Sequence, residues 1–207
     1  MDMMNTHFVA SLLSLDKGDG APVSFLQNSL VYDARNLLAS QAIDNGFDKV
    51  LWLDSDVTFS PDLLTRLSAD MDEGRELVCG ICVKRKAPIE PCIYKAVYTT
   101  TEKDGKIMPH ADPYYDYPHD EIFEIAACGF GAVLTSVDLL RRVYEKCGLP
   151  FSPQIGFGED LSFCKRVEAL GVPMYCDSRV KVGHVGYTIF TEETYKGAGK
   201  TAPASEG

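Results

Sequence analysis

The chain has 207 residues, of which 45% are hydrophobic and 24% charged, and it carries a net charge of −10. This length suits one globular domain, and no apolar run approaches the roughly 18 residues that a membrane-spanning helix needs. The negative charge argues against a broad electrostatic grip on nucleic acid, but it allows a nucleotide ligand whose charge a metal neutralises. The N-terminus lacks the basic residues of a signal peptide and the cysteines number seven, an odd count, so we expect a reducing, cytoplasmic location.

The first half of the chain predicts alternating strands and helices. Strands are expected at 7–15, 49–53 and 76–82. A helix is expected over 24–45, where apolar residues recur at helical spacing, and a second helix begins at Ser60-Pro61-Asp62 and ends near Met71. This order predicts an α/β fold with a parallel sheet and a ligand site at the carboxyl ends of its strands.

The second half predicts shorter elements. Strands are expected at 91–97, 122–128, 131–136, 173–176 and 179–184, and helices at 137–147 and 159–170. Residues 99–121 are polar and predict a long surface loop or hairpin. Cys79 and Cys82 match C-x-x-C, but within a strand they would point to opposite faces, so we expect neither a redox pair nor a zinc site there.

The stretch KVLWLDSDV, residues 49–57, ends an apolar strand with two carboxylates, Asp54 and Asp56. A divalent cation would relieve their repulsion, and Mg²⁺ and Mn²⁺ suit oxygen ligands. Such a metal can also bind the phosphates of a nucleotide diphosphate and stabilise the charge of a departing diphosphate. Asp70-Met71-Asp72 has the same spacing, but it lies at a polar helix end before Gly74, where a solvated face is expected. The preceding strand therefore favours Asp54 and Asp56 as the metal site.

Two further clusters carry titratable side chains. Glu159 and Asp160 begin a helix after a glycine-containing loop, where they could stabilise the helix dipole or provide a general base. His184 ends a strand between Gly183 and Gly186, where it could be structural or could serve as a third ligand for Mn²⁺. These residues alone leave both alternatives open.

Together these segments resemble a GT-A fold glycosyltransferase, closest to the family 2-like enzymes. The matching segments are LWLDSD (51–56), GFGEDLSFCKRV (156–167) and VGHVGY (182–187), with looser likeness in FLQNSLVYDARN (25–36) and CGFGAVLTSVDLLRRV (128–143). The resemblance implies a Rossmann-like, mostly parallel sheet flanked by helices, with a small antiparallel second sheet. It also implies one catalytic domain over 1–190, with a nucleotide-sugar-binding half at about 7–97, an acceptor-binding half at about 98–190 and a flexible tail at 191–207.

The resemblance implies a role for each matching acid and for the histidine. Asp56 and His184 would bind Mn²⁺ or Mg²⁺, and Asp54 would lie near the metal or the ribose of the donor. Asp160, with Glu159 beside it, would deprotonate the acceptor hydroxyl.

Basic residues and glycines complete the expected donor site. Arg35 would contact the base or diphosphate of the donor. Lys84 and Arg85 precede Lys86 at the end of strand 76–82, where they could contact a phosphate or the acceptor, or form a solvated charge run. Gly129 and Gly131 would let the backbone approach the sugar, with a bulge or tight turn as the alternative.

The function implied is the metal-dependent transfer of a sugar from a nucleotide-diphosphate sugar, with a UDP-sugar favoured, to an acceptor hydroxyl by inverting displacement. The acceptor could be a saccharide or a hydroxylated nucleobase of DNA. One alternative is a sugar-nucleotide nucleotidyltransferase, although residues 16–24 lack the arginine of its phosphate loop. The other alternative is a non-catalytic nucleotide-sugar-binding protein. The predicted first strand also lacks the proline and acid that hold the nucleoside base in the family.

Overall fold

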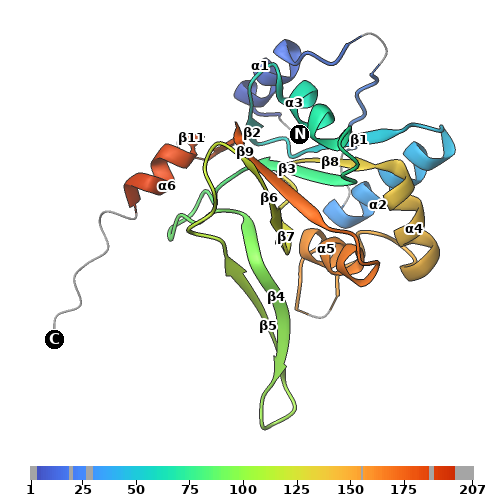
Figure 1. The fold of residues 1–207 in the computed structure, drawn as a ribbon, viewed down its shortest axis with the longest axis vertical. Coiled ribbons are helices and arrows are strands. Elements are labelled where there is room, and N and C mark those ends of the chain that lie inside the picture. The colour runs from blue at the N-terminus through green and yellow to red at the C-terminus, as the bar shows by residue number, and fades with distance from the viewer. Residues whose placement is uncertain (1–3, 19–20, 27–29, 155, 187–188, 199–207) are drawn as a thin grey trace.

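The computed structural model describes residues 4–18, 21–26, 30–154, 156–186 and 189–198. A five-stranded sheet forms its centre (Figure 1). In spatial order its strands are β1 (Lys49–Leu53), β8 (Ala132–Ser136), β3 (Leu77–Ile81), β9 (Met174–Lys181) and β6 (Ile122–Ile125). The predicted strands 49–53 and 76–82 therefore both belong to the central sheet. The predicted strand 179–184 covers the end of β9 and the start of the next strand, β10 (Gly183–Val185).

The central sheet is mixed rather than mostly parallel. Strand β8 runs antiparallel to both β1 and β3, and β6 runs antiparallel to β9. Because β3 pairs in parallel with β9, the strands β1, β3 and β9 all point the same way. The α/β fold class is confirmed, and three carboxyl ends still meet at one edge of the sheet.

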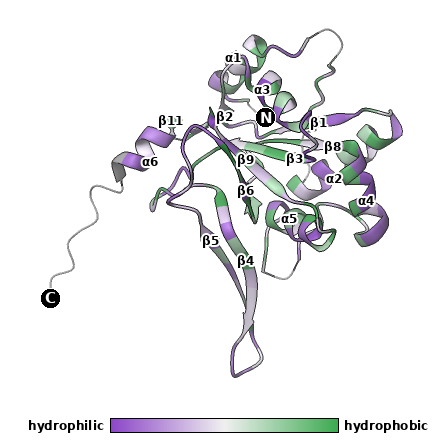
Figure 2. Ribbon diagram, in the orientation of Figure 1, coloured by the Kyte–Doolittle hydropathy of each residue, from purple (hydrophilic) through white to green (hydrophobic). Residues whose placement is uncertain are grey.

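Helices cover both faces of this sheet, so the fold has three layers. Helices α2 (Val31–Asp44), α4 (Val137–Cys147) and α5 (Glu159–Ala169) pack on one face, while α1 (Thr6–Ser14) and α3 (Leu63–Met71) pack on the other. Side chains of β3 and of Cys82, which follows it, alternate between the two cores, with Cys79 in one and Cys82 in the other. The prediction that these cysteines point to opposite faces is confirmed. Figure 2 shows hydrophobic residues along the central strands and hydrophilic residues on α6.

Two predicted elements differ from the structure at the N-terminal end. Residues 7–14 lie in helix α1 rather than in a strand, and Leu15 is its C-cap. Asn5 stabilises the start of the helix by accepting a hydrogen bond from the His7 amide at 2.9 Å. The buried Phe8 packs edge-on against Phe59 at 6.2 Å between ring centroids. The helix expected over 24–45 begins only at Val31, and its residues 27–29 lie outside the described part of the chain.

Smaller elements extend from the central layers. Strands β4 (Ile93–Thr101) and β5 (Ile107–Pro113) form a hairpin, which is one of the two alternatives expected for 99–121, although its first strand begins within the predicted strand 91–97. The hairpin projects from the body as an arm and pairs at its base with β7 (Ala127–Cys128). A second small sheet joins β2 (Val57–Thr58), β10 (Gly183–Val185) and β11 (Ile189–Phe190). None of the described helices is long and apolar enough to cross a bilayer.

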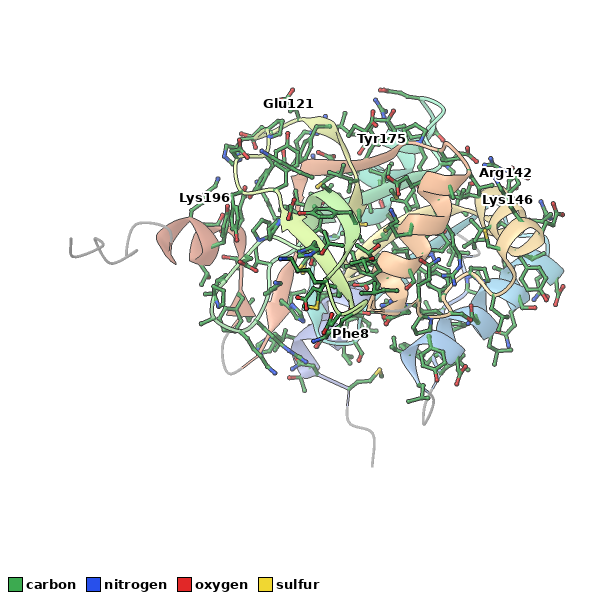
Figure 3. All side chains as sticks on the ribbon, turned by 90° about the horizontal axis from the view of Figure 1, so that it is seen from below. Phe8, Glu121, Arg142, Lys146, Tyr175 and Lys196 are labelled. Carbon is green, nitrogen blue, oxygen red and sulfur yellow. The ribbon has the colours of Figure 1, made fainter. Side chains whose placement is uncertain are left out.

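The segment expected to be a flexible tail includes helix α6 (Glu192–Ala198). Its Glu192 is only 3% exposed and accepts a hydrogen bond from Tyr117 Oη at 2.9 Å. Figure 3 shows Lys196 of this helix at one end of the molecule and Arg142 of α4 at the other. The start of the expected tail is therefore attached to the domain.

Candidate functional site

The carboxyl edge of β1, β3 and β9 gathers the predicted metal ligands. Asp54 and Asp56 follow β1, and His184 lies in β10, which follows β9. Strand β10 pairs with β2, which places His184 opposite Val57, and the Val185 amide donates to the Asp56 carbonyl at 2.7 Å. As a result His184 Nε2 lies 3.4 Å from Asp56 Oδ2.

The ring of His184 is fixed by the backbone at the end of β3. Its Nδ1 donates a hydrogen bond to the Val83 carbonyl at 3.0 Å, which leaves Nε2 facing Asp56. A carbonyl that orients the second ring nitrogen is typical of histidines that bind metals. The hydrogen bond between the two side chains raises the pKa of His184 and lowers the pKa of Asp56. Sequence alone gave no sign of the Val83 carbonyl, because a backbone acceptor leaves no pattern of side chains.

The two basic residues expected near the donor have different partners. The Arg85 guanidinium forms an ion pair with Asp56 and also lies 3.5 Å from the Val185 carbonyl. Lys84 instead pairs with Glu90 at 2.6 Å. Of the two side chains, Arg85 is therefore the one that faces the candidate metal ligands.

Arg35 connects the end of β1 with the beginning of α5. It is only 7% exposed, and it donates to Asp54 Oδ1 at 2.7 Å and to Glu159 Oε1 at 2.6 Å. Its guanidinium also lies over the ring of Phe130, 5.0 Å from the centroid. Burial raises the pKa of Asp54 although Arg35 opposes the shift. The structure therefore gives Arg35 two carboxylate partners, and its predicted donor contact stays a prediction.

Asp160 lies at the first turn of α5, beside the Arg35 network. It is partly buried, and its Oδ1 accepts a hydrogen bond from the Leu161 amide at 2.7 Å. A Cβ atom added to Gly129 would lie 3.7 Å from Asp160 Oδ2, so this glycine borders the carboxylate. Burial raises the pKa of Asp160, which moves it toward the range of an effective general base.

Gly129 and Gly131 make room for two cysteines. A Cβ atom at Gly131 would lie 3.3 Å from Cys82 Sγ, and one at Gly129 would lie 3.3 Å from Cys92 Cβ. The backbone at both glycines therefore packs closely against cysteine side chains, and the predicted approach to the sugar stays a prediction. The adjacent thiols influence each other, since their hydrogen bond lowers the pKa of Cys92 and raises the pKa of Cys82. The pairing of Cys82 with Cys92 could not be predicted from the sequence, because the two residues lie ten positions apart and match no local motif.

The candidate metal ligands suit a divalent ion that also binds phosphates or water. Among the residues that the structure describes, no group of three or more His, Cys, Asp and Glu side chains is arranged to hold a metal. Asp56 and His184 form a two-residue set, and Asp54 is turned toward Arg35. Mg²⁺, and Mn²⁺ with similar oxygen preference, commonly bind through one or two protein side chains together with substrate phosphates and water.

Comparison with known proteins shows the fold. No protein-family model matches the sequence, and no curated protein matches it. The crystal structure of A197 from STIV is similar, with a TM-score of 0.60, 20% identity, and coverage of 87% of this chain and 79% of that one. The crystal structure of GalNAc-T7 with UDP, GalNAc and Mn²⁺ has a TM-score of 0.51 and 15% identity. That match covers 75% of this chain and only 30% of the GalNAc-T7 chain. The protein thus has a GT-A-like fold.

Proposed function

We propose that this protein is a metal-dependent glycosyltransferase that moves a sugar from a nucleotide-diphosphate sugar, with a UDP-sugar favoured, to an acceptor hydroxyl. The observation that carries the proposal is the 3.4 Å contact between Asp56 and His184, with the imidazole oriented by the Val83 carbonyl. The similar fold of GalNAc-T7, solved with UDP and Mn²⁺, supports it. We also propose a cytoplasmic location, which agrees with seven free cysteines.

Asp56 and His184 would hold Mn²⁺ or Mg²⁺ through a carboxylate oxygen and an imidazole nitrogen. When bound, such an ion stabilises the negative charge on a departing diphosphate. Arg85 neutralises Asp56 in the structure, and its side chain is 46% exposed. With Asp56 occupied by a metal, the Arg85 guanidinium would be free to turn toward a phosphate of the donor.

Asp160 would accept the proton of the acceptor hydroxyl. Its raised pKa favours proton abstraction, because a base is most effective when its pKa lies near the working pH. Arg35 pairs with both Asp54 and Glu159, the residue before Asp160. These two ion pairs fix the start of α5 relative to the end of β1. A carboxylate that activates the acceptor while the diphosphate leaves on the other side of the anomeric carbon would give an inverting transfer. The acceptor would be a saccharide or a hydroxylated nucleobase.

The test begins with a screen of nucleotide sugars by thermal shift in the presence of Mn²⁺. Sugar transfer from each stabilising donor to saccharide and hydroxymethylated-base acceptors is then measured by mass spectrometry. We expect Asp160→Asn to keep the donor-dependent shift and to lose roughly 10²- to 10⁴-fold in turnover. Glu168→Gln is the matched control, because Glu168 lies on the same helix but is exposed and paired with Lys165 at 2.6 Å.

Three outcomes would contradict this proposal. Transfer at the wild-type rate by Asp160→Asn would refute the assignment of the base. Release of pyrophosphate from a nucleoside triphosphate and a sugar phosphate would favour a nucleotidyltransferase. Donor binding without transfer or donor hydrolysis would favour a non-catalytic binding protein.

A further inference from the structure

Cys82 and Cys92 lie opposite each other in a short antiparallel segment just beyond β3. Val83 and Pro91 form an antiparallel bridge, and the Cys92 amide donates to the Cys82 carbonyl at 2.9 Å. Residues directly opposite in antiparallel strands have Cα atoms about 4.5–5.5 Å apart, which lies within the range of about 4.4–6.8 Å found in disulfides. The backbone therefore already holds the two cysteines at bonding separation.

The side chains of Cys82 and Cys92 also project toward the same short segment, residues 129–131. Gly131 faces the Cys82 sulfur and Gly129 faces the Cys92 Cβ, each with its missing Cβ position at 3.3 Å. Both glycines lie in the short bent stretch between β7 and β8. Side chains directly opposite each other in an antiparallel pair lie on the same face, so both cysteines lie on one side of the bridge. Cys92 is partly exposed and Cys82 is buried behind it, so a reagent in solution reaches Cys92 first.

Other cysteines lack this combination of proximity and access. The structure has four in its core, fully buried, and one exposed on α4: Cys79, Cys128, Cys164, Cys176 and Cys147. Among the described residues, Cys82 and Cys92 are thus a pair with one accessible member at the edge of the candidate site.

We propose that Cys82 and Cys92 form a reversible thiol–disulfide pair that responds to low-molecular-weight disulfides such as oxidised glutathione. The Cys92 thiolate attacks one sulfur of the oxidised glutathione, forms a mixed disulfide and releases one glutathione thiolate, which takes up a proton. The Cys82 thiolate then attacks the Cys92 sulfur and releases the second glutathione. The two protein thiols are oxidised by two electrons and the reagent is reduced to two thiols.

This disulfide would act on the orientation of His184. Val83 follows Cys82 directly, and its carbonyl accepts the hydrogen bond from His184 Nδ1. The Cys92 carbonyl in turn accepts from the Gly129 amide at 2.8 Å, beside Asp160. Bond formation would rotate the Cys82 side chain and could shift the adjacent Val83 carbonyl. Because loss of such an orienting contact weakens metal binding by about 10- to 100-fold, we expect weaker Mn²⁺ binding in the oxidised protein. This consequence rests on the proposed function, whereas formation of the disulfide does not.

The experiment treats the folded protein with oxidised glutathione, blocks free thiols and digests it with trypsin without reduction. We expect a cross-link between the peptides 76–84 and 87–95, assigned to Cys82 rather than Cys79 by fragmentation. Intact mass should fall by two hydrogen atoms and return to the original value with dithiothreitol. Phenylarsine oxide, which bridges neighbouring thiols, should bind once per chain at this pair.

Variants separate the pair from the remaining cysteines. Cys92→Ser and Cys92→Ala should both abolish the cross-link and the arsenical binding, whereas Cys147→Ser should change neither. A glutathione adduct on Cys92 or Cys147 without the cross-link would overturn the proposal. Mn²⁺ binding is measured in the reduced and the cross-linked protein. Equal affinity in the two forms would refute the link to His184. Failure of the reduced protein to bind Mn²⁺ would contradict the proposed function and leave the cross-link standing.

Discussion

Asp54 and Asp56 can be compared with Asp70 and Asp72, a second pair of acids with the same spacing in the chain. The first pair follows a strand, and its members contact Arg35, Arg85 and His184 at the carboxyl edge of the sheet. The second pair lies at the end of α3, where residues two positions apart point in different directions. Equal spacing therefore leaves both acids at one edge of the sheet in the first pair and turns the acids in different directions in the second.

The members of the second pair have separate environments. Asp70 is only 6% exposed and accepts from Arg179 at 2.9 Å, while the Asp72 side chain is 72% exposed and pairs with Lys49 at 2.8 Å. The expectation of a solvated face is thus wrong for Asp70. A carboxylate turned into the protein and one turned to solvent cannot share one ion, so the comparison shows that direction, rather than spacing, makes a D-x-D pair a candidate metal site.

Substitution of one acid from each pair gives the largest expected difference. Asp56→Asn should weaken Mn²⁺-dependent donor binding by about 100-fold or more, because it removes a direct candidate ligand while Arg85 and His184 stay in place. Asp72→Asn should leave that binding unchanged. Isothermal titration of Mn²⁺ with the donor present measures both. Equal affinities in the two variants would remove the distinction between the pairs.

The arginine partners of the two pairs provide the second test. Arg35→Gln leaves Asp54 and Glu159 without their shared cation and should lower the free energy of unfolding by about 3 kcal/mol, the low end for buried pairs because Asp54 is 39% exposed. Arg179→Gln should cost less, because the Arg179 side chain is 44% exposed. Urea unfolding measures both changes. Arg35→Lys should recover only part of the loss, since one ammonium cannot bridge both carboxylates as a guanidinium does. A larger loss in Arg179→Gln would contradict the comparison.

The carboxyl edge could be predicted from the sequence, but the strand directions could not. Apolar runs followed by Asp54 and by Lys84 showed where β1 and β3 end, because local composition marks a strand end. The direction of β8 between them depends on how the chain returns to the sheet, which no local pattern records. The predicted position of this edge is nevertheless correct. Strand β8 runs antiparallel to both β1 and β3, so these two strands point the same way and end at the same edge.

Two other predictions were wrong, one for a reason near in the sequence and one for a reason far along the chain. The segment HFVASLLSL is short and apolar, and such runs are ambiguous between strand and helix. Asn5, a good helix cap just before it, was the available signal for α1. The burial of Asp70 depends instead on Asp177 and Arg179, which lie far along the chain, so no inspection of residues near Asp70 could reveal it.

The pH dependence of stability tests the second pair further. Burial and the neighbouring Asp177 raise the pKa of Asp70 to about 6 from an ordinary value of 3.8, although Arg179 and Arg75 oppose the shift. Between these two values the folded protein keeps a proton that the unfolded chain has released. The contribution of Asp70 to stability is therefore greatest at low pH and falls as pH rises, by at most about 3 kcal/mol between pH 4 and pH 7.

Asp70→Asn should remove this dependence. The free energy of unfolding of the wild type relative to Asp70→Asn should fall from pH 4 to pH 7 in urea titrations. Asp72→Asn, whose carboxylate is exposed, should run parallel to the wild type over the same range. A constant difference between wild type and Asp70→Asn across this range would show that Asp70 titrates as an ordinary carboxylate.

The smallest effect should come from substitution of Arg85, whose guanidinium already neutralises Asp56. Arg85 and a divalent ion compete for the same carboxylate, so Arg85→Ala should bind Mn²⁺ alone severalfold more tightly, on the order of the 0.2–1 kcal/mol of an exposed ion pair. Lys84→Ala is the matched control, because Lys84 pairs with Glu90. If Arg85 then turns to the donor, the same Arg85→Ala protein should bind the nucleotide sugar more weakly. Opposite shifts for metal and donor would show that Arg85 exchanges Asp56 for a phosphate, and parallel shifts would show that it only supports the fold of the loop.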